Sequence, residues 1–277
     1  MEVTPQGKEI IFSLSERKPK EKEITLDISS FPSFWLTRYL ETLYINNYTK
    51  IILTYSNKEI FRNPTGDWEN LRQAIKRISN RFIGMEIVAQ TASMTELHCF
   101  ISQEEKDIGQ IEKRIFFLWK DAIDELLHHI EKDTPLSYQE IYEQHDNIIR
   151  FITYYLRMLG QSALPEEEKR QRFAFYMIFD KVLDKYRHLG NRIEQYGCSK
   201  KVKKYLEDIF KLVQDLFLMM YKQEADMELI KRRYDLVERI VKEKFTVEEL
   251  RVMAEADIFL NILNDLGRMV IVRKLGR

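Results

Sequence analysis

Cysteine is nearly absent from this chain: only Cys99 and Cys198 occur among 277 residues, and neither has a partner at C-x-x-C spacing. A zinc site built on thiolates needs cysteines paired at such a spacing, so this class of site is excluded. Two cysteines also cannot supply the disulfide framework of a small secreted domain. The chain is therefore expected to work in a reducing compartment.

An excess of charge of one sign is also missing, because 44 Lys and Arg residues balance 44 Asp and Glu residues. This balance counts against the whole molecule being a nucleic-acid binder, although it leaves room for a local basic patch. Long apolar runs are absent as well, since the stretch around Leu212–Tyr221 is interrupted by Gln214 and Asp215. The first residues have neither the basic nor the apolar segment of a secretory signal. We expect a cytoplasmic protein without a transmembrane segment.

Glycine and proline are sparse, 9 and 6 in all, and they separate the chain into periodic segments. Residues 1–23 are interpreted as an N-terminal strand and a charged connector, which includes the mixed-charge run Glu16–Glu23. In residues 24–104, apolar alternation predicts strands and helical spacing predicts helices. The predicted order is a strand at 24–28, a helix at 33–46, a strand at 50–55, a helix at 68–82, and strands at 85–88 and 96–101. This order indicates a small α+β sandwich with helices over one face of a sheet.

Residues 105–277 carry helical periodicity in segments of about 20 to 30 residues. Capping boxes, in which a Ser or Thr is followed three residues later by Glu, mark helix starts at Ser102, Ser137 and Thr246. Short connections between long amphipathic helices favour antiparallel neighbours. The predicted fold class is thus α+β, with a small N-terminal α+β sandwich followed by an all-α antiparallel six-helix bundle.

Three short matches in the same order indicate that the bundle is two copies of a three-helix unit, at about 105–197 and 199–277. They pair 115–121 with 209–215, 146–150 with 235–239, and 188–190 with 265–267. If the copies are equivalent, Asp146 and Asp235 correspond on the second helices. Gly190 and Gly267 are then expected at matching close crossings of the third helices. A mid-helix glycine costs roughly 1 kcal/mol relative to alanine, so its presence in both copies needs a packing reason.

The segment Arg81-Phe-Ile-Gly84-Met-Glu86-Ile-Val88 is similar to the R-L-I-G-L-E-I-V segment of the PhoU family in its archaeal-type, two-domain form. The helical repeats behind it resemble the two PhoU repeats, and the resemblance extends over roughly residues 20–277. It implies a regulator of phosphate uptake that acts in the cytoplasm beside a phosphate transporter or signalling proteins, and a homodimer is expected. Many archaeal-type members carry an N-terminal swapped-hairpin DNA-binding domain, of which residues 7–14 would be only the last strand. DNA is therefore not the favoured partner.

The resemblance also implies where a metal would bind. The family signature is a pair of acids four residues apart on one helix, which share a hard cation, with a further acid on the third helix. Matched residue by residue, the candidate metal ligands are His145, Asp146, His188, Asp235, Glu238 and Asp265. The pair positions hold His145 and Ile149 in the first repeat, and Tyr234 and Glu238 in the second. Because few carboxylates remain, we expect no multinuclear cluster and no resident cofactor, while a single divalent or iron ion stays open.

The remaining groups of polar residues are better explained by a structural role than by a catalytic or metal-binding one. Glu125 and His128 have the E-x-x-H spacing of di-iron bundles, but the chain has no second E-x-x-H. Basic clusters at 200–204 and 231–233 are interpreted as solvated faces, with contact to an anionic lipid, phosphate or acidic partner as the alternative. No GxxxxGK, GxGxxG or GxSxG motif occurs. The sequence therefore predicts that the protein is not an enzyme.

Three functions remain open at this point. The leading one is a non-catalytic regulator of phosphate homeostasis that binds partner proteins through broad amphipathic helical faces. The first alternative is a transcription regulator that contacts DNA through its N-terminal region. The second is a metal-binding helical bundle with a redox or storage role. Salt-dependent retention on DNA would favour the first alternative, and iron or manganese bound after purification would favour the second.

Overall fold

The computed structural model describes residues 2–6, 9–13, 22–62, 66–101, 108–132, 134, 137–222 and 227–275. Its first two strands, β1 (Glu2–Gln6) and β2 (Glu9–Ser13), pair as an antiparallel hairpin. A single strand was predicted within residues 1–23, so the structure adds a second one. Most of the predicted charged connector, residues 14–21, lies outside the described residues.

A four-stranded sheet forms the α+β part, in the order β3-β4-β8-β7. Its strands are β3 (Glu23–Asp27), β4 (Lys50–Thr54), β7 (Met85–Gln90) and β8 (Met94–Cys99). β3 and β4 run parallel because helix α1 (Ser33–Ile45) carries the chain back between them. The β4–β8 and β7–β8 pairs are antiparallel.

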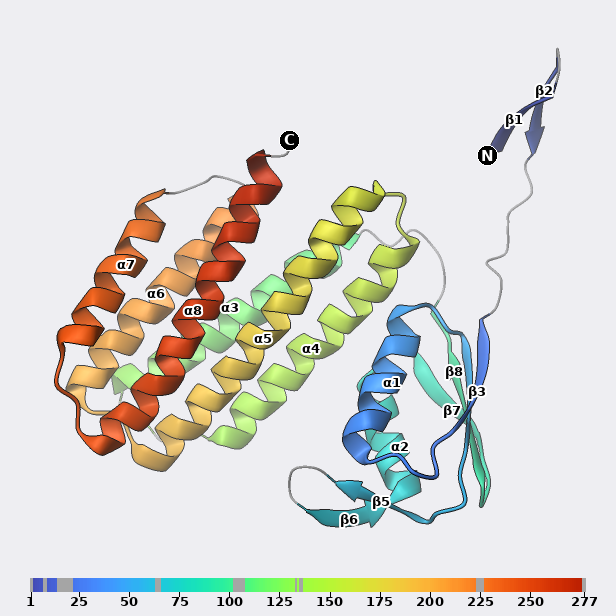
Figure 1. Cartoon of the computed structure of the whole chain (residues 1–277), viewed down its shortest axis with the longest axis horizontal. Coiled ribbons are helices and arrows are strands. Elements are labelled where there is room, and N and C mark those ends of the chain that lie inside the picture. Colours follow the sequence, from blue (N-terminus) through green and yellow to red (C-terminus); the bar gives the residue numbers. More distant parts are fainter. Residues whose placement is uncertain are drawn as a thin grey trace.

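Two helices cover one face of this sheet, α1 and α2 (Leu71–Ser79) (Figure 1). Residues alternate along the central strands, as a half-buried sheet requires. Leu53 and Leu97 are fully buried, whereas Lys50 and Glu96 form an ion pair at 3.5 Å on the outer face. The predicted sandwich of one sheet and two helices is therefore present.

A hairpin between β4 and α2 was not predicted. Its strands are β5 (Glu59–Arg62) and β6 (Asp67–Asn70). Trp68, expected at the start of a helix, lies instead in β6 opposite Phe61. The helix starts later because the Asn70 side chain accepts hydrogen bonds from the amides two and three residues further on. The predicted helix at 68–82 is thus too long at both ends.

From residue 108 onward, the described chain is six helices joined by short connections. They are α3 (Ile108–Lys132), α4 (Tyr138–Gln161), α5 (Glu166–Tyr196), α6 (Lys200–Lys222), α7 (Met227–Lys242) and α8 (Val247–Leu275). The Ser137 hydroxyl caps α4 by accepting from the Glu140 amide. Thr246 and Glu249 form the reciprocal bonds of a complete capping box before α8. The box predicted at Ser102 lies outside the described residues.

These helices pack side by side (Figure 1). α3 contacts α4 and α6, α4 contacts α5, α5 contacts α8, and α6 contacts α7 and α8. α1 also contacts α4, so the α+β part and the helical part share an interface. The fold class is α+β, with a small N-terminal sheet followed by a helical region, as predicted.

The two glycines expected at equivalent crossings lie in different surroundings. A Cβ added at Gly190 would overlap Cδ1 of Ile141 on α4, so α4 and α5 approach closely there. At Gly267 the nearest atom to such a Cβ is Cδ1 of Leu216 on α6, at 3.4 Å, which is an ordinary contact. α5 thus packs on α4, the second helix of its own copy. α8 packs most extensively on α5 of the first copy and, within its own copy, more on α6 than on α7. The prediction of matching close crossings is wrong.

Candidate functional site

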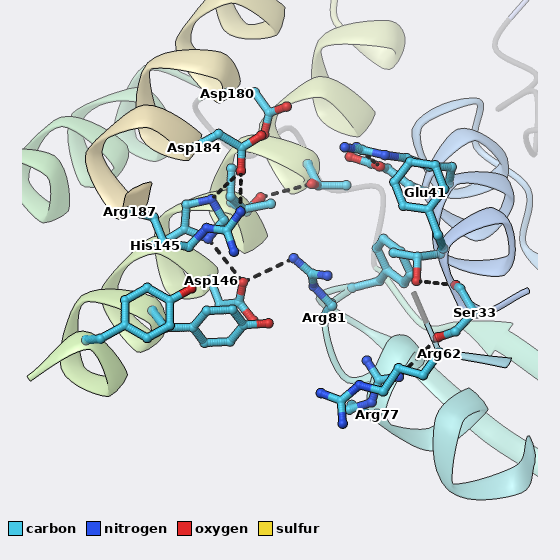
Figure 2. Close-up of a pocket in the computed structure, with 18 residues that line it drawn as sticks. Ser33, Glu41, Arg62, Arg77, Arg81, His145, Asp146, Asp180, Asp184 and Arg187 are labelled. Atoms are coloured by element: carbon cyan, nitrogen blue, oxygen red, sulfur yellow. Dashed lines mark hydrogen bonds and ion pairs between the residues drawn. The ribbon is translucent and has the colours of Figure 1, made fainter. Parts of the chain in front are cut away.

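A cavity of about 400 Å³ lies where the α+β part meets the helical part (Figure 2). One wall is formed by α1, α2, β5 and the turn between α2 and β7, and the other by α4 and α5. The volume falls in the range of small-molecule sites, roughly 300–1,000 Å³, and such sites often lie between two packed parts of a protein. This cavity is therefore the candidate site.

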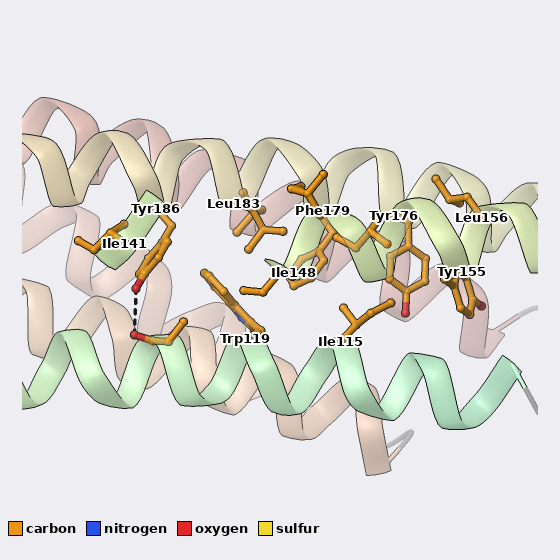
Figure 3. Close-up of a cluster of buried hydrophobic side chains, with 14 of the residues drawn as sticks. Ile115, Trp119, Ile141, Ile148, Tyr155, Leu156, Tyr176, Phe179, Leu183 and Tyr186 are labelled. Atoms are coloured by element: carbon orange, nitrogen blue, oxygen red, sulfur yellow. Dashed lines mark hydrogen bonds between the residues drawn. The ribbon is translucent and has the colours of Figure 1, made fainter. Parts of the chain in front are cut away.

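The helical wall of the cavity is fixed by a core on its other side (Figure 3). Phe179 and Tyr186 of α5 are buried there, and Trp119 of α3 packs edge-on against both, with ring centres 5.6 and 5.3 Å away. Because α5 buries this face, Asp180 and Arg187, each one position further along the chain, line the cavity instead. Helical periodicity thus divides α5 between packing and the site.

Arginine is concentrated in this cavity. The five guanidinium groups that line it belong to Arg38, Arg62, Arg77, Arg81 and Arg187. Arg77 lies in the last turn of α2 and Arg81 in the turn that follows, while the β5–β6 hairpin adds Arg62 to the same wall. Gly84 allows that turn to close, since its φ of 78° is in the left-handed region that glycine adopts readily. Four arginines of the α+β part, including Arg38 of α1, therefore share one cavity with Arg187 of α5.

Four of these arginines are held by carboxylates through a single terminal nitrogen. Nη1 of Arg38 lies 2.8 Å from Glu41 on the same helix. The Nη2 to oxygen distances are 2.6 Å for Arg77–Glu69, 3.1 Å for Arg81–Asp146 and 3.1 Å for Arg187–Asp184. The Arg81–Asp146 pair joins the turn before β7 to α4, so it bridges the two parts of the chain. A guanidinium group has five N–H donors, and each of these arginines therefore keeps donors for a ligand.

His145 lies at the centre of the helical wall and is 5% exposed. Its Nδ1 lies 3.2 Å from Oδ1 of Asp146, and its Nε2 lies 3.3 Å from Oδ1 of Asp184. The second distance suits an ion pair, but its geometry does not make a hydrogen bond, so Nε2 is buried without a hydrogen-bond partner. Burial lowers the pKa of His145, yet the two carboxylates outweigh it, and the net shift is upward.

Two acids on α5 have opposite pKa shifts. Burial acts to raise the pKa of Asp184, but the adjacent His145 and Arg187 outweigh it and lower the pKa to about 2. At Asp180, burial and the nearby carboxylates of Asp184 and Glu41 raise the pKa to about 6. Asp180 is thus ionised at neutral pH in surroundings that disfavour its charge, which suits it to accept a donor from a ligand.

The six predicted metal ligands do not converge. His145 and Asp146 lie together in the cavity, while His188 is exposed on α5. The candidates from the second repeat are all exposed on α7 and α8, namely Asp235, Glu238 and Asp265. In the part of the chain that the structure describes, no three His, Cys, Asp or Glu side chains form a group that could hold a metal ion. The expected absence of a resident cofactor stays a prediction.

His145 and Asp146 are the two predicted site residues that reach the cavity, and most of their neighbours there were not predicted. The sequence did carry one signal, because Asp180, Asp184 and Arg187 fall at i, i+4 and i+7, on one face of a helix. On the other wall, Arg77 and Arg81 are also four residues apart, but Arg62 comes from the β5–β6 hairpin, which was not predicted.

Glu125 and the two basic clusters that the sequence analysis singled out make contacts within the fold. Glu125 accepts a hydrogen bond from a glutamine of α4. Lys201, in the first basic cluster, forms an ion pair with Glu249 at 3.3 Å. Arg232, in the second, pairs with Asp215 at 2.9 Å. Acids of neighbouring helices thus neutralise part of each basic cluster.

No family model, curated protein or solved structure matches this chain. Among the helices of the described residues, none combines the length and the apolar character needed to cross a membrane. The arginine-lined cavity is therefore the main guide to function.

Proposed function

We propose that this protein is a non-catalytic regulator of phosphate homeostasis, which acts through protein partners and responds to a phosphate-bearing anion in the cavity. The observation that supports the proposal is the set of five arginines that two separate parts of the chain bring into one cavity. Arginine stays charged at physiological pH and presents paired N–H donors that match a phosphate group. A phosphate-bearing ligand is therefore the kind that this cavity favours.

A ligand in this position contacts both parts of the molecule. Arg77 and Arg81 belong to the α+β part, whereas His145 and Arg187 belong to the helices. A ligand that binds both walls stabilises the arrangement in which they lie close together. A partner protein that distinguishes this arrangement from a looser one then responds to ligand occupancy.

The PhoU resemblance supports the same function. The segment that carries it, Arg81–Val88, contributes Arg81 to the cavity and to the ion pair with Asp146. In this proposal α3–α8 form the antiparallel bundle of the family, built from two three-helix units whose packing has diverged. The partner is a phosphate transporter or signalling protein, and the regulator acts in the cytoplasm as a homodimer.

Titration of orthophosphate into the full chain, followed by isothermal calorimetry, tests the ligand. We expect saturable binding to the wild type, and about tenfold weaker binding to Arg81→Gln because a charge-assisted contact is lost. Arg170→Gln is the matched control, since Arg170 is exposed on α5 and pairs with Glu167 away from the cavity. No binding, or equal binding by the two variants, would remove the basis of the proposal.

Uptake of radiolabelled phosphate tests the regulatory role in the cells that encode this protein. We expect deletion of its gene to change how the uptake rate depends on external phosphate. Arg170→Gln should restore the normal dependence, and Arg81→Gln should not. Uptake that is unchanged by the deletion would contradict a role in phosphate homeostasis.

A further inference from the structure

We propose that the cavity binds a nucleoside phosphate, with the phosphate at the end formed by Arg62, Arg77 and Arg81 and the base beside Tyr142, directed toward Asp180. This inference rests on the proposed function, because it names the phosphate-bearing ligand of the same cavity. Size, polarity and aromatic lining each contribute to it.

The cavity is much larger than orthophosphate needs. A volume of about 400 Å³ corresponds to roughly a dozen water molecules at ~30 Å³ each. Orthophosphate alone would fill a small part of this space and leave the rest to water. A phosphate that is attached to a larger organic group therefore matches the cavity better.

The cavity has a basic end and an end of mixed charge, where Arg187 pairs with Asp184 at 3.1 Å and Asp180 adds a further carboxylate. Figure 2 shows Arg62 and Arg77 at one end and Asp180 and Asp184 at the other, with Arg81 between them. A ligand that complements both ends carries an anion on one side and hydrogen-bond donors on the other. A phosphate joined to a base with an exocyclic amino group has this distribution of charge and donors.

Aromatic rings also line the cavity. Tyr142 of α4 is half-buried, with its ring centre 6.4 Å from the ring of His145 and 5.7 Å from the guanidinium carbon of Arg187. Phe34 lines the opposite wall from α1 and is 49% exposed. Flat aromatic side chains of this kind stack with nucleobases, whose rings offer a matching face. A base therefore fits beside Tyr142 better than a flexible aliphatic group.

Calorimetric titration of the full chain at neutral pH with four ligands tests this inference: adenosine 5′-monophosphate, inosine 5′-monophosphate, adenosine and orthophosphate. We expect the adenosine monophosphate to bind about tenfold or more tightly than orthophosphate, in line with the contribution of stacking. It should also bind about tenfold more tightly than the inosine monophosphate, whose carbonyl oxygen replaces the amino group that faces Asp180. Adenosine should bind more weakly than its monophosphate because it lacks the phosphate.

Two variants test which residues contact the base of the ligand. Tyr142→Leu should weaken binding of the adenosine monophosphate about tenfold and leave orthophosphate binding unchanged, whereas Asp180→Asn should abolish the preference for adenosine over inosine. Tyr234→Leu is the matched control for the first, since Tyr234 is 54% exposed on α7, outside the cavity. Circular dichroism checks that each variant is folded, and the comparison of ligands on the wild type needs no variant.

The outcomes separate this inference from the proposed function. Orthophosphate that binds as tightly as the adenosine monophosphate would overturn the inference and leave the proposed function in place. Adenosine that binds as tightly as its monophosphate, or a Tyr142→Leu variant that binds like Tyr234→Leu, would also overturn it. If neither orthophosphate nor either nucleotide binds, both proposals fail.

Discussion

At the scale of single residues, Asp180 carries a charge that its surroundings disfavour. Burial and the carboxylates of Asp184 and Glu41 raise its pKa to about 6, above that of an unfolded aspartate. Folding therefore increases its proton affinity. The resulting contribution to stability is complete below about pH 4 and is lost as the pH rises through about 6. A residue that destabilises the fold at neutral pH is typical of a functional site.

Asp180→Asn removes this ionisation and keeps the shape of the side chain. We expect the variant to be more stable than the wild type at about pH 7.5, by on the order of 2 kcal/mol, with the difference shrinking toward pH ~5. Urea denaturation at several pH values measures it, with Asp121→Asn as the control because Asp121 is exposed on α3. An Asp180→Asn protein that is no more stable than the wild type at the higher pH would show that the pKa is not raised.

Gly190 and Gly267 offer a second test at this scale. Gly190→Leu should lower the free energy of unfolding by about 1–3 kcal/mol, because its side chain would overlap Ile141 of α4. Gly267→Ala should instead raise it by up to about 1 kcal/mol, since the added methyl group meets only an ordinary contact and alanine favours the helix. Thermal denaturation compares the two. Equal destabilisation would mean that both glycines lie at close crossings after all.

Site residues could be predicted from the sequence only where the pattern that marks them lies within one segment of the chain. His145 and Asp146 were selected as metal ligands, and both line the cavity, but the other four candidates lie elsewhere. Helical spacing along one chain segment was visible, as for Asp180 and Asp184. The pairing of Arg81 with Asp146 was not, because nothing local in the sequence links a turn to a helix more than sixty residues away.

At the scale of elements, Arg157 of α4 forms hydrogen bonds with the C-terminal end of α1. The residue is 3% exposed, and its Nη1 donates to the carbonyls of Tyr44, at 2.5 Å, and Tyr48, at 3.2 Å. It also lies over the ring of Tyr44, 4.8 Å from its centre. The last carbonyls of a helix lack partners within the helix. Arg157 thus completes α1 from a different part of the chain.

Replacing Arg157 with Met keeps most of its length and removes these donors. We expect Arg157→Met to lower the free energy of unfolding by about 2–4 kcal/mol, because buried carbonyls lose charge-assisted hydrogen bonds. Arg150→Met on the same helix is the control, since Arg150 is exposed and its loss should cost no more than about 0.5 kcal/mol. Chemical denaturation gives both values. Similar losses for the two variants would show that the contact with α1 contributes little.

The helices were predicted well and one hairpin was missed, for a physical reason. Long amphipathic helices repeat their apolar spacing over many turns, and capping residues such as Ser137 and Thr246 mark their starts. The strands β5 and β6 are four residues each and largely exposed, with Ile60 as the one fully buried side chain between them. Strands this short and polar show no clear alternation of apolar and polar residues. The predicted helix was therefore extended backward over the last residues of the hairpin.

At the scale of the whole molecule, the cavity is where the two parts of the chain are coupled. The order of the α+β part and the helical part along the chain could be predicted from the spacing of apolar residues in the sequence. Their interface could not, since it depends on contacts such as Arg81–Asp146 and Arg157–Tyr44. These contacts hold the walls of the cavity together without a ligand, and a phosphate-bearing ligand is expected to add to them.

Hydrogen exchange of the full chain, read by mass spectrometry with and without saturating orthophosphate, tests this coupling directly. We expect the ligand to slow amide exchange in both walls at once, in residues 33–41 of α1 and in residues 142–153 of α4. Residues 227–242, which form α7 and do not line the cavity, should exchange at an unchanged rate. No slowing at all, or slowing confined to one wall, would contradict a ligand that bridges the two parts.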